Sequence, residues 1–138
     1  MKTIRLATAQ FELTHNIDRN LEAILELSKK ACAEGSRLIV FPECAISGYP
    51  GGDMVDLSGV DPYKVQDALQ SISAQAAEMR MFIAAGVALP LDDRRGWTNA
   101  LVVFDDTGRT AGNPGRRYHR GHDSHFGSLS LYSEVFHS

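Results

Sequence analysis

The order of hydrophobic and polar residues along the chain predicts strands that alternate with helices. Residues 3–9 alternate between two faces and are β-prone, which predicts a strand. Apolar residues then recur at helical spacing over 17–32, with Asn16 as the capping residue and a stop at Gly35. Residues 38–41 form a continuous apolar run closed by a proline, which is typical of a strand covered on both faces.

The pattern continues with a second helix and ends in a hairpin. Residues 45–62 are rich in glycine, proline and aspartate and predict a loop. A helix is predicted over residues 63–79, followed by strands at 81–89 and 98–104. A turn at 105–108 leads from the last of these into a further short strand. Strands that alternate with helices in this way predict a layered α/β fold.

The last 26 residues differ from the rest of the chain. Only seven residues of 113–138 are hydrophobic, whereas the whole chain is 43% hydrophobic. A segment of this composition buries little apolar surface and is expected to be irregular unless a partner covers it. We therefore predict a domain over residues 1–112 and an irregular tail over residues 113–138.

Composition and charge exclude several classes of protein. The chain has 138 residues, the length of one domain, and a formal net charge of −3, which argues against a nucleic-acid binder. No apolar run approaches the roughly 18 residues of a membrane span, and the first residues do not resemble a signal peptide. The two cysteines are therefore expected to be reduced thiols in a cytoplasmic protein.

Glu43 is the first candidate for chemistry, because it directly follows the apolar run at 38–41. In open α/β sheets, ligands bind at the carboxyl ends of the strands, and a carboxylate there can act as a general base. The plainer interpretation is a solvated glutamate at the end of a strand, and the residues alone leave both open. We interpret the adjacent Cys44 as a packing residue, because a neighbouring carboxylate disfavours its thiolate.

Histidines recur every third residue in the tail, at His119, His122 and His125, with Asp123 among them. Such a cluster can hold a metal ion. Glycine and serine interrupt the run, however, and no helical pattern surrounds it. We favour a solvated tail and predict no metal site, with a metal-binding module as the alternative.

Several segments in continuous order resemble the nitrilase, or carbon–nitrogen hydrolase, superfamily. The run from Leu38 to Glu43 resembles its first signature, and residues 4–10 resemble its opening strand. Residues 47–50 resemble the loop after its glutamate, and residues 82–86 and 98–103 resemble its next strands. The likeness covers roughly residues 2–112, and several linked motifs at the right spacing make it specific.

The resemblance implies a mechanism in which glutamate, lysine and cysteine hydrolyse an amide or nitrile C–N bond without a cofactor. Glu43 stands at the position of the general base, and Tyr49 in the following loop is a candidate for substrate binding. Arg120 aligns with the lysine, or Asp123 in another alignment, and neither residue is lysine. The cysteine would follow some tens of residues further on, past Ser138.

The resemblance also implies a fold, a four-layer αββα sandwich, of which this chain would be about the first half. Two helices would then cover one face of the sheet, and the other face would lack its partner sheet. An exposed apolar face favours self-association, so we expect a homo-oligomer.

Two functional hypotheses follow. The chain is either a truncated or frame-shifted relative of an enzyme that acts on a small-molecule amide or nitrile, inactive alone, or a non-catalytic half-domain that works by association with itself or a partner.

Overall fold

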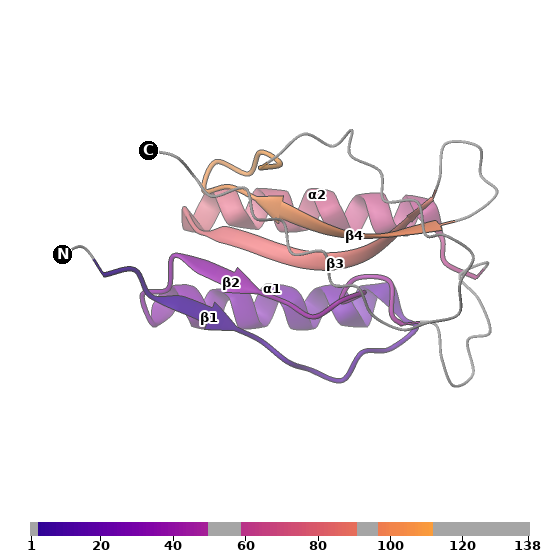
Figure 1. Ribbon diagram of the computed structural model, residues 1–138, viewed down its shortest axis with the longest axis horizontal. Coiled ribbons are helices and arrows are strands. Elements are labelled where there is room, and N and C mark those ends of the chain that lie inside the picture. Colours follow the sequence, from indigo (N-terminus) through magenta and orange to yellow (C-terminus); the bar gives the residue numbers. More distant parts are fainter. Residues whose placement is uncertain (1–2, 50–58, 91–96, 112–138) are drawn as a thin grey trace.

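A four-stranded mixed sheet forms the centre of the molecule (Figure 1). The computed structural model describes residues 3–49, 59–90 and 97–111. The strands are β1 (Leu6–Thr8), β2 (Leu38–Val40), β3 (Phe82–Pro90) and β4 (Trp97–Phe104), and they lie in the order β1-β2-β3-β4. The first three are parallel to one another, and β4 is antiparallel to β3. The first four of the five predicted strands are present, although β1 is shorter than predicted.

The two helices begin and end where local signals place them. In α1 (Ile17–Ala33), the side chain of Asn16 accepts a hydrogen bond from the Arg19 amide at 3.1 Å, and Gly35 follows with a φ of 81°. In α2 (Pro62–Met79), the side chain of Asp61 caps the first turn, and the proline occupies its start. The helix therefore begins one residue before the predicted start, because proline is well suited to a first helical turn.

Both helices cover the same face of the sheet (Figure 1). The chain passes from β1 through α1 to β2, and from β2 through α2 to β3, always to the next strand in one direction. Crossovers between parallel strands are almost always right-handed, so two steps in one direction bring both helices to one side. The largest fully buried core side chains include Ile24, Ile39, Ile46, Ile72 and Ile83.

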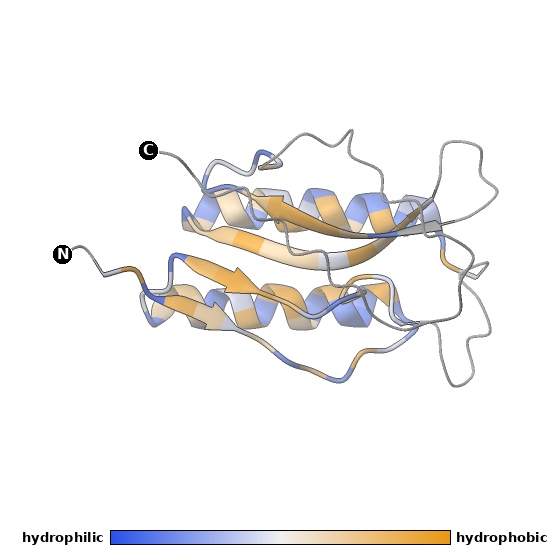
Figure 2. Ribbon diagram, viewed as in Figure 1, coloured by the Kyte–Doolittle hydropathy of each residue, from blue (hydrophilic) through white to orange (hydrophobic). Residues whose placement is uncertain are grey.

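Because neighbouring residues of a strand point to opposite faces, every second side chain lies on the face that the helices do not cover. Leu101 pairs with Gly86, and Leu6 pairs with Leu38. Neither leucine belongs to the core cluster, and they expose 62% (Leu6) and 51% (Leu101) of their surface. Within the described residues, no helix packs on this face, which agrees with the predicted arrangement. Figure 2 shows that the strands are mainly hydrophobic, whereas the helices alternate between hydrophobic and polar positions.

The turn after β4 has its predicted form. The carboxylate of Asp105 accepts hydrogen bonds from the backbone amides of Thr107 at 2.8 Å and Arg109 at 3.0 Å. The Thr107 hydroxyl also donates to this carboxylate, and its hydrogen bond, followed by those of the two amides, holds the pKa of Asp105 below its usual range. The expected short strand beyond it is, in the described residues, a single bridge between Phe104 and Thr110. Neither helix of the described ranges has the length and apolar character to cross a membrane.

Candidate functional site

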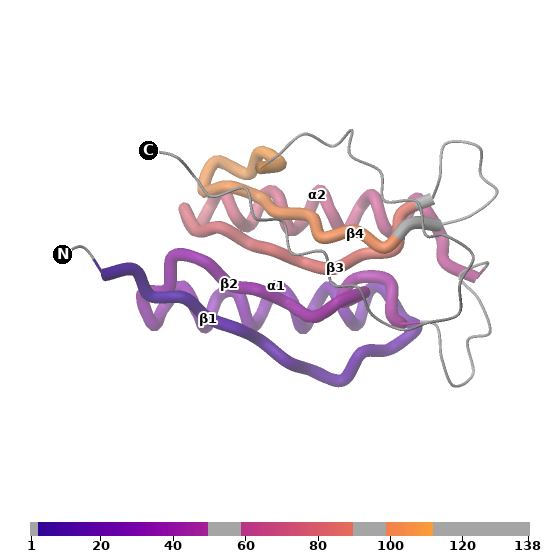
Figure 3. The backbone as a smooth tube through the Cα atoms, in the orientation of Figure 1, coloured from indigo at the N-terminus to yellow at the C-terminus, as the bar shows by residue number. Residues whose placement is uncertain are grey.

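Glu43 begins the turn that follows β2 after two residues, just beyond the carboxyl ends of β1 and β2 and beside Gly86 in the middle of β3. Figure 3 shows the backbone leaving β2 beside β3. Two backbone hydrogen bonds tie this turn to β3, from the Phe41 amide to the Ala84 carbonyl (2.8 Å) and from the Ile46 amide to the Gly86 carbonyl (3.1 Å). The turn is thus held against the central part of the sheet.

Gly86 allows the turn to lie directly against β3. A Cβ atom at this position would lie 2.5 Å from the Pro42 carbonyl oxygen and 2.5 Å from the Cys44 amide nitrogen. The Gly86 amide also donates a hydrogen bond to the Pro42 oxygen at 3.2 Å. Any side chain at this position would displace the backbone on both sides of Glu43.

A buried asparagine holds the other side of the turn. The Nδ2 of Asn20 donates to the carbonyl oxygens of Thr14 (2.7 Å) and Ile46 (3.2 Å), and its Oδ1 accepts from the Thr14 amide at 3.0 Å. Ser47, also buried, accepts a hydrogen bond from the Ala88 amide at 3.1 Å. The backbone that carries Glu43 is therefore fixed from α1 and from β3.

The Glu43 side chain is exposed, and its Oε1 accepts a hydrogen bond from the Nδ2 of Asn99. Asn99 is near the start of β4, opposite Ala88 in the ladder with β3. It has the same strand parity as Leu101, so Glu43 meets it on the face that the helices do not cover. The carboxylate is thus accessible from the open side of the sheet.

Cys44 is a packing residue, as predicted. Its side chain is 3% exposed, and its Sγ lies 3.7 Å from the Oδ1 of Asn99. Burial, and after it the charge of Glu43, raise the pKa of the Cys44 thiol to about 11. A thiol buried in this way is poorly accessible to a substrate, which argues against Cys44 as the nucleophile of a hydrolase. Both Cys44 and Cys32 are free, as expected.

The structure places only part of the predicted site. Tyr49, 37% exposed, is at the end of the described part of the loop after Glu43. Arg120, the alternative Asp123 and the tail histidines lie outside the described residues. Among the described residues, no cluster of histidine, cysteine, aspartate or glutamate could hold a metal ion.

Sequence reasoning missed two residues of the site, Asn99 and Gly86. Both carry a signal: an amide side chain in a strand of mainly apolar residues, and a glycine within an apolar strand, which often marks a close approach of backbone.

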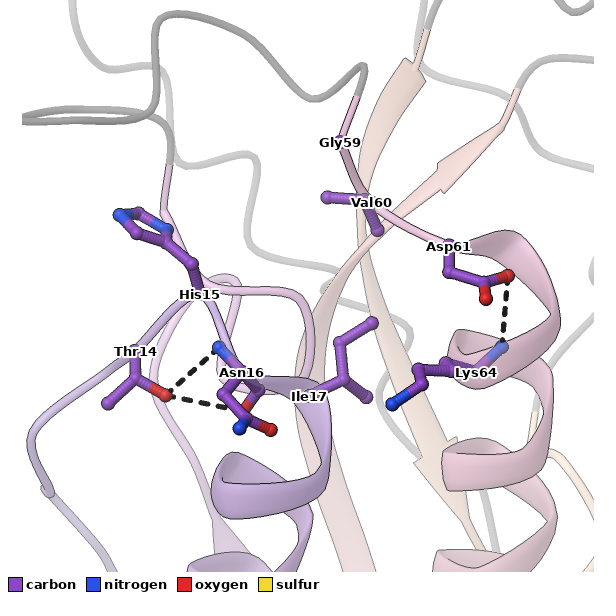
Figure 4. Close-up of a pocket in the computed structure, with 8 residues that line it drawn as sticks. All are labelled: Thr14, His15, Asn16, Ile17, Gly59, Val60, Asp61 and Lys64. Carbon is purple, nitrogen blue, oxygen red and sulfur yellow. Dashed lines mark hydrogen bonds between the residues drawn. The ribbon is translucent and has the colours of Figure 1, made fainter.

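A cavity of about 490 Å³ lies elsewhere, between the N-terminal ends of the two helices (Figure 4). His15 and Lys64 line it, but Asn16 and Asp61 cap their own helices there. Lys64 is also paired with Asp18 at 2.5 Å. Asn16, Asp61 and Lys64 are thus already engaged within the protein. The cavity contains none of Glu43, Cys44 and Asn99.

Curated relatives match most of this chain. A glutamine-dependent NAD(+) synthetase from Acinetobacter baylyi is 39% identical over 107 residues, which cover 76% of this chain and 19% of the relative. The omega-amidase NIT2 from Bos taurus is 29% identical over 108 residues, which cover 78% of this chain and 38% of the relative. The chain thus spans well under half the length of these proteins.

Solved structures share the fold. An amidase from Nesterenkonia sp. superposes with a TM-score of 0.65 at 16% identity, over 79% of this chain and 41% of the amidase. A variant of the amidase from Nesterenkonia sp. AN1 in complex with butyramide superposes with a TM-score of 0.64 at 16% identity. The superposition covers 78% of this chain and 41% of the amidase. At this identity, the likeness shows the α/β fold of nitrilase-superfamily amidases.

The family model of carbon-nitrogen hydrolases matches residues 5–131, nearly the whole chain. The match contains the glutamate that follows β2, the turn that holds it and the strand that contacts it. On this evidence, the chain belongs to the carbon–nitrogen hydrolase family.

Proposed function

We propose that this chain carries the general base of a hydrolase that acts on a small primary amide, and that Glu43 is that base. The observation that carries the proposal is an exposed carboxylate at the carboxyl edge of the sheet, held by an amide donor and reached from the open face. The names of two relatives, a glutamine-dependent synthetase and an omega-amidase, favour an amide over a nitrile as the substrate.

In this reaction, the Glu43 carboxylate accepts the proton of a cysteine thiol while the sulfur bonds to the amide carbon. The C–N bond then breaks, and the nitrogen leaves as ammonia with the proton returned by Glu43. Water, deprotonated by the same carboxylate, hydrolyses the resulting thioester. Cys44 is unsuited to the role of nucleophile, because its side chain is buried and a substrate cannot reach it.

We further propose that the chain alone does not turn over amides or nitriles. Its sequence has no cysteine after Cys44 and no lysine after Lys64, so the described site provides the base without its two partners. The test is ammonia release from glutamine, butyramide and simple nitriles, with Glu43→Gln as the matched control. We expect both proteins to give the same background rate. Turnover by the unmodified protein that is lost in Glu43→Gln would overturn the proposed inactivity and support Glu43 as the base.

A second candidate role is self-association through the open sheet face, favoured by the exposure of Leu6 and Leu101. Large apolar side chains on one face suit a twofold dimer, because an identical face can be self-complementary. Sedimentation equilibrium at micromolar concentration should detect a dimer, and the double variant Leu6→Lys/Leu101→Lys should be a monomer. A folded monomer in the unmodified protein would exclude this role.

A further inference from the structure

Asn99 lies between the two side chains at the start of the turn after β2. Its Nδ2 donates a hydrogen bond to the Oε1 of Glu43, and its Oδ1 lies 3.7 Å from the Sγ of Cys44. The contact spans 56 residues of sequence, and it forms because β4 runs antiparallel beside β3 and starts at the edge where β2 ends. One amide thus bridges Glu43 and its neighbour.

The orientation of the amide follows from the chemistry of its two partners. A carboxylate only accepts hydrogen bonds, so it must face the NH₂ group. The Cys44 thiol is protonated at neutral pH, and its Sγ can donate to the amide oxygen 3.7 Å away. Each end of Asn99 therefore meets the partner that suits it, and a flipped amide would lose both contacts.

We propose that Asn99 is a positioning residue that holds the Glu43 carboxylate in one orientation on the open side of the sheet, with the Cys44 thiol setting the direction of its amide. The assignment rests on the proposed role of Glu43 as general base. An exposed glutamate side chain otherwise samples several rotamers, whereas proton transfer requires a defined geometry of the reacting groups. Since Asn99 engages Oε1, the second oxygen can accept a proton.

The experiment is NMR on the isotope-labelled full chain. Three-bond couplings report whether the Glu43 side chain occupies one rotamer. We expect a single rotamer in the unmodified protein and averaged couplings in Asn99→Leu, which keeps a similar volume without a donor. Leu101→Ala, on the same face of β4, is the matched control and should leave the Glu43 couplings unchanged.

Asn99→Asp gives a second measurement, because it keeps the shape of the side chain and replaces the donor with a like charge. We expect averaged couplings in this variant too. Backbone amide spectra establish that each variant is folded, so a purely structural loss is seen separately. An averaged Glu43 in the unmodified protein, or a single rotamer that persists in both folded Asn99 variants, would overturn the proposal.

The thiol has its own pair of variants. Cys44→Ser keeps a donor and should retain the single Glu43 rotamer. Cys44→Ala has no donor, so its Glu43 couplings should be partly averaged. Equal couplings in the two would remove Cys44 from the proposal. These readouts do not depend on turnover, so they can fail while the proposed function stands, and the amide assays can fail while Asn99 still orders Glu43.

Discussion

The two faces of the sheet are covered very differently. On one face, Ile83 and Val87 of β3 are 0% exposed beneath α1 and α2. On the other face, Ala84 and Ala88 of β3 are buried as well, and the difference lies in the outer strands, where Leu6 of β1 and Leu101 of β4 expose 62% and 51%. Apolar residues occupy both faces of the same strands, so the difference comes from what packs on the sheet and not from the composition of the strands.

The comparison bears on the site, because Glu43 and Asn99 meet on the less covered face. The covered face provides the core that keeps the strands in register. The other face presents the Glu43 carboxylate, whose backbone is held firmly by Gly86 and Asn20. The core beneath the helices thus supports a candidate site, Glu43 and Asn99, that is accessible from the other face of the sheet.

The largest expected effect contrasts one side chain from each face. Ile83→Ala should lower the free energy of unfolding by about 2–5 kcal/mol, because it leaves a cavity in the core. Leu101→Ala should change it by less than about 0.5 kcal/mol. Urea unfolding of both variants, at a protein concentration too low for association, measures the difference. A similar loss in both would show that the second face is covered as well as the first.

The next effect concerns the edge that carries the site. Gly86→Ala should cost about 1–3 kcal/mol of stability, because its Cβ would collide with backbone atoms beside Glu43. Gly59→Ala is the control, since no atom lies within 4 Å of the Cβ that it would add. Thermal unfolding of the two variants measures the effect. The close approach is refuted if the two transitions shift equally.

The smallest expected effect is a pH dependence from the Cys44 thiol, which lies where the core meets the site. Its pKa is raised from 9.0 to about 11, so the unfolded chain loses this proton at a lower pH than the folded protein does. The protonated thiol therefore contributes its full stabilisation of the folded protein below pH 9. As the pH rises towards 11, this contribution is lost, and the free energy of unfolding falls by about 1–2 kcal/mol.

Urea unfolding at pH 8 and pH 11 measures this loss. Between these two pH values, the free energy of unfolding should decline less in Cys44→Ala than in the unmodified protein. The variant lacks the thiol, and all other groups that titrate in this range are the same in both proteins. Identical declines would mean that the thiol is less buried than the structure indicates.

Local patterns accounted for much of the fold. The cap at Asn16, the stop at Gly35 and the turn at 105–108 each depend on hydrogen bonds or backbone angles within a few residues. For that reason they can be predicted from sequence. The position of Glu43 at a strand end follows in the same way, from the apolar run that precedes it.

The contacts that make Glu43 part of a site could not be predicted locally. Asn99 reaches it only because Asn99 pairs with Ala88, and this register depends on how the strands assemble. Gly86 matters because a turn from another strand crosses it, and no pattern around residue 86 specifies which backbone approaches. Local sequence thus indicated where a base could stand, and long-range strand pairing determined what holds it, because pairing joins residues far apart in the chain.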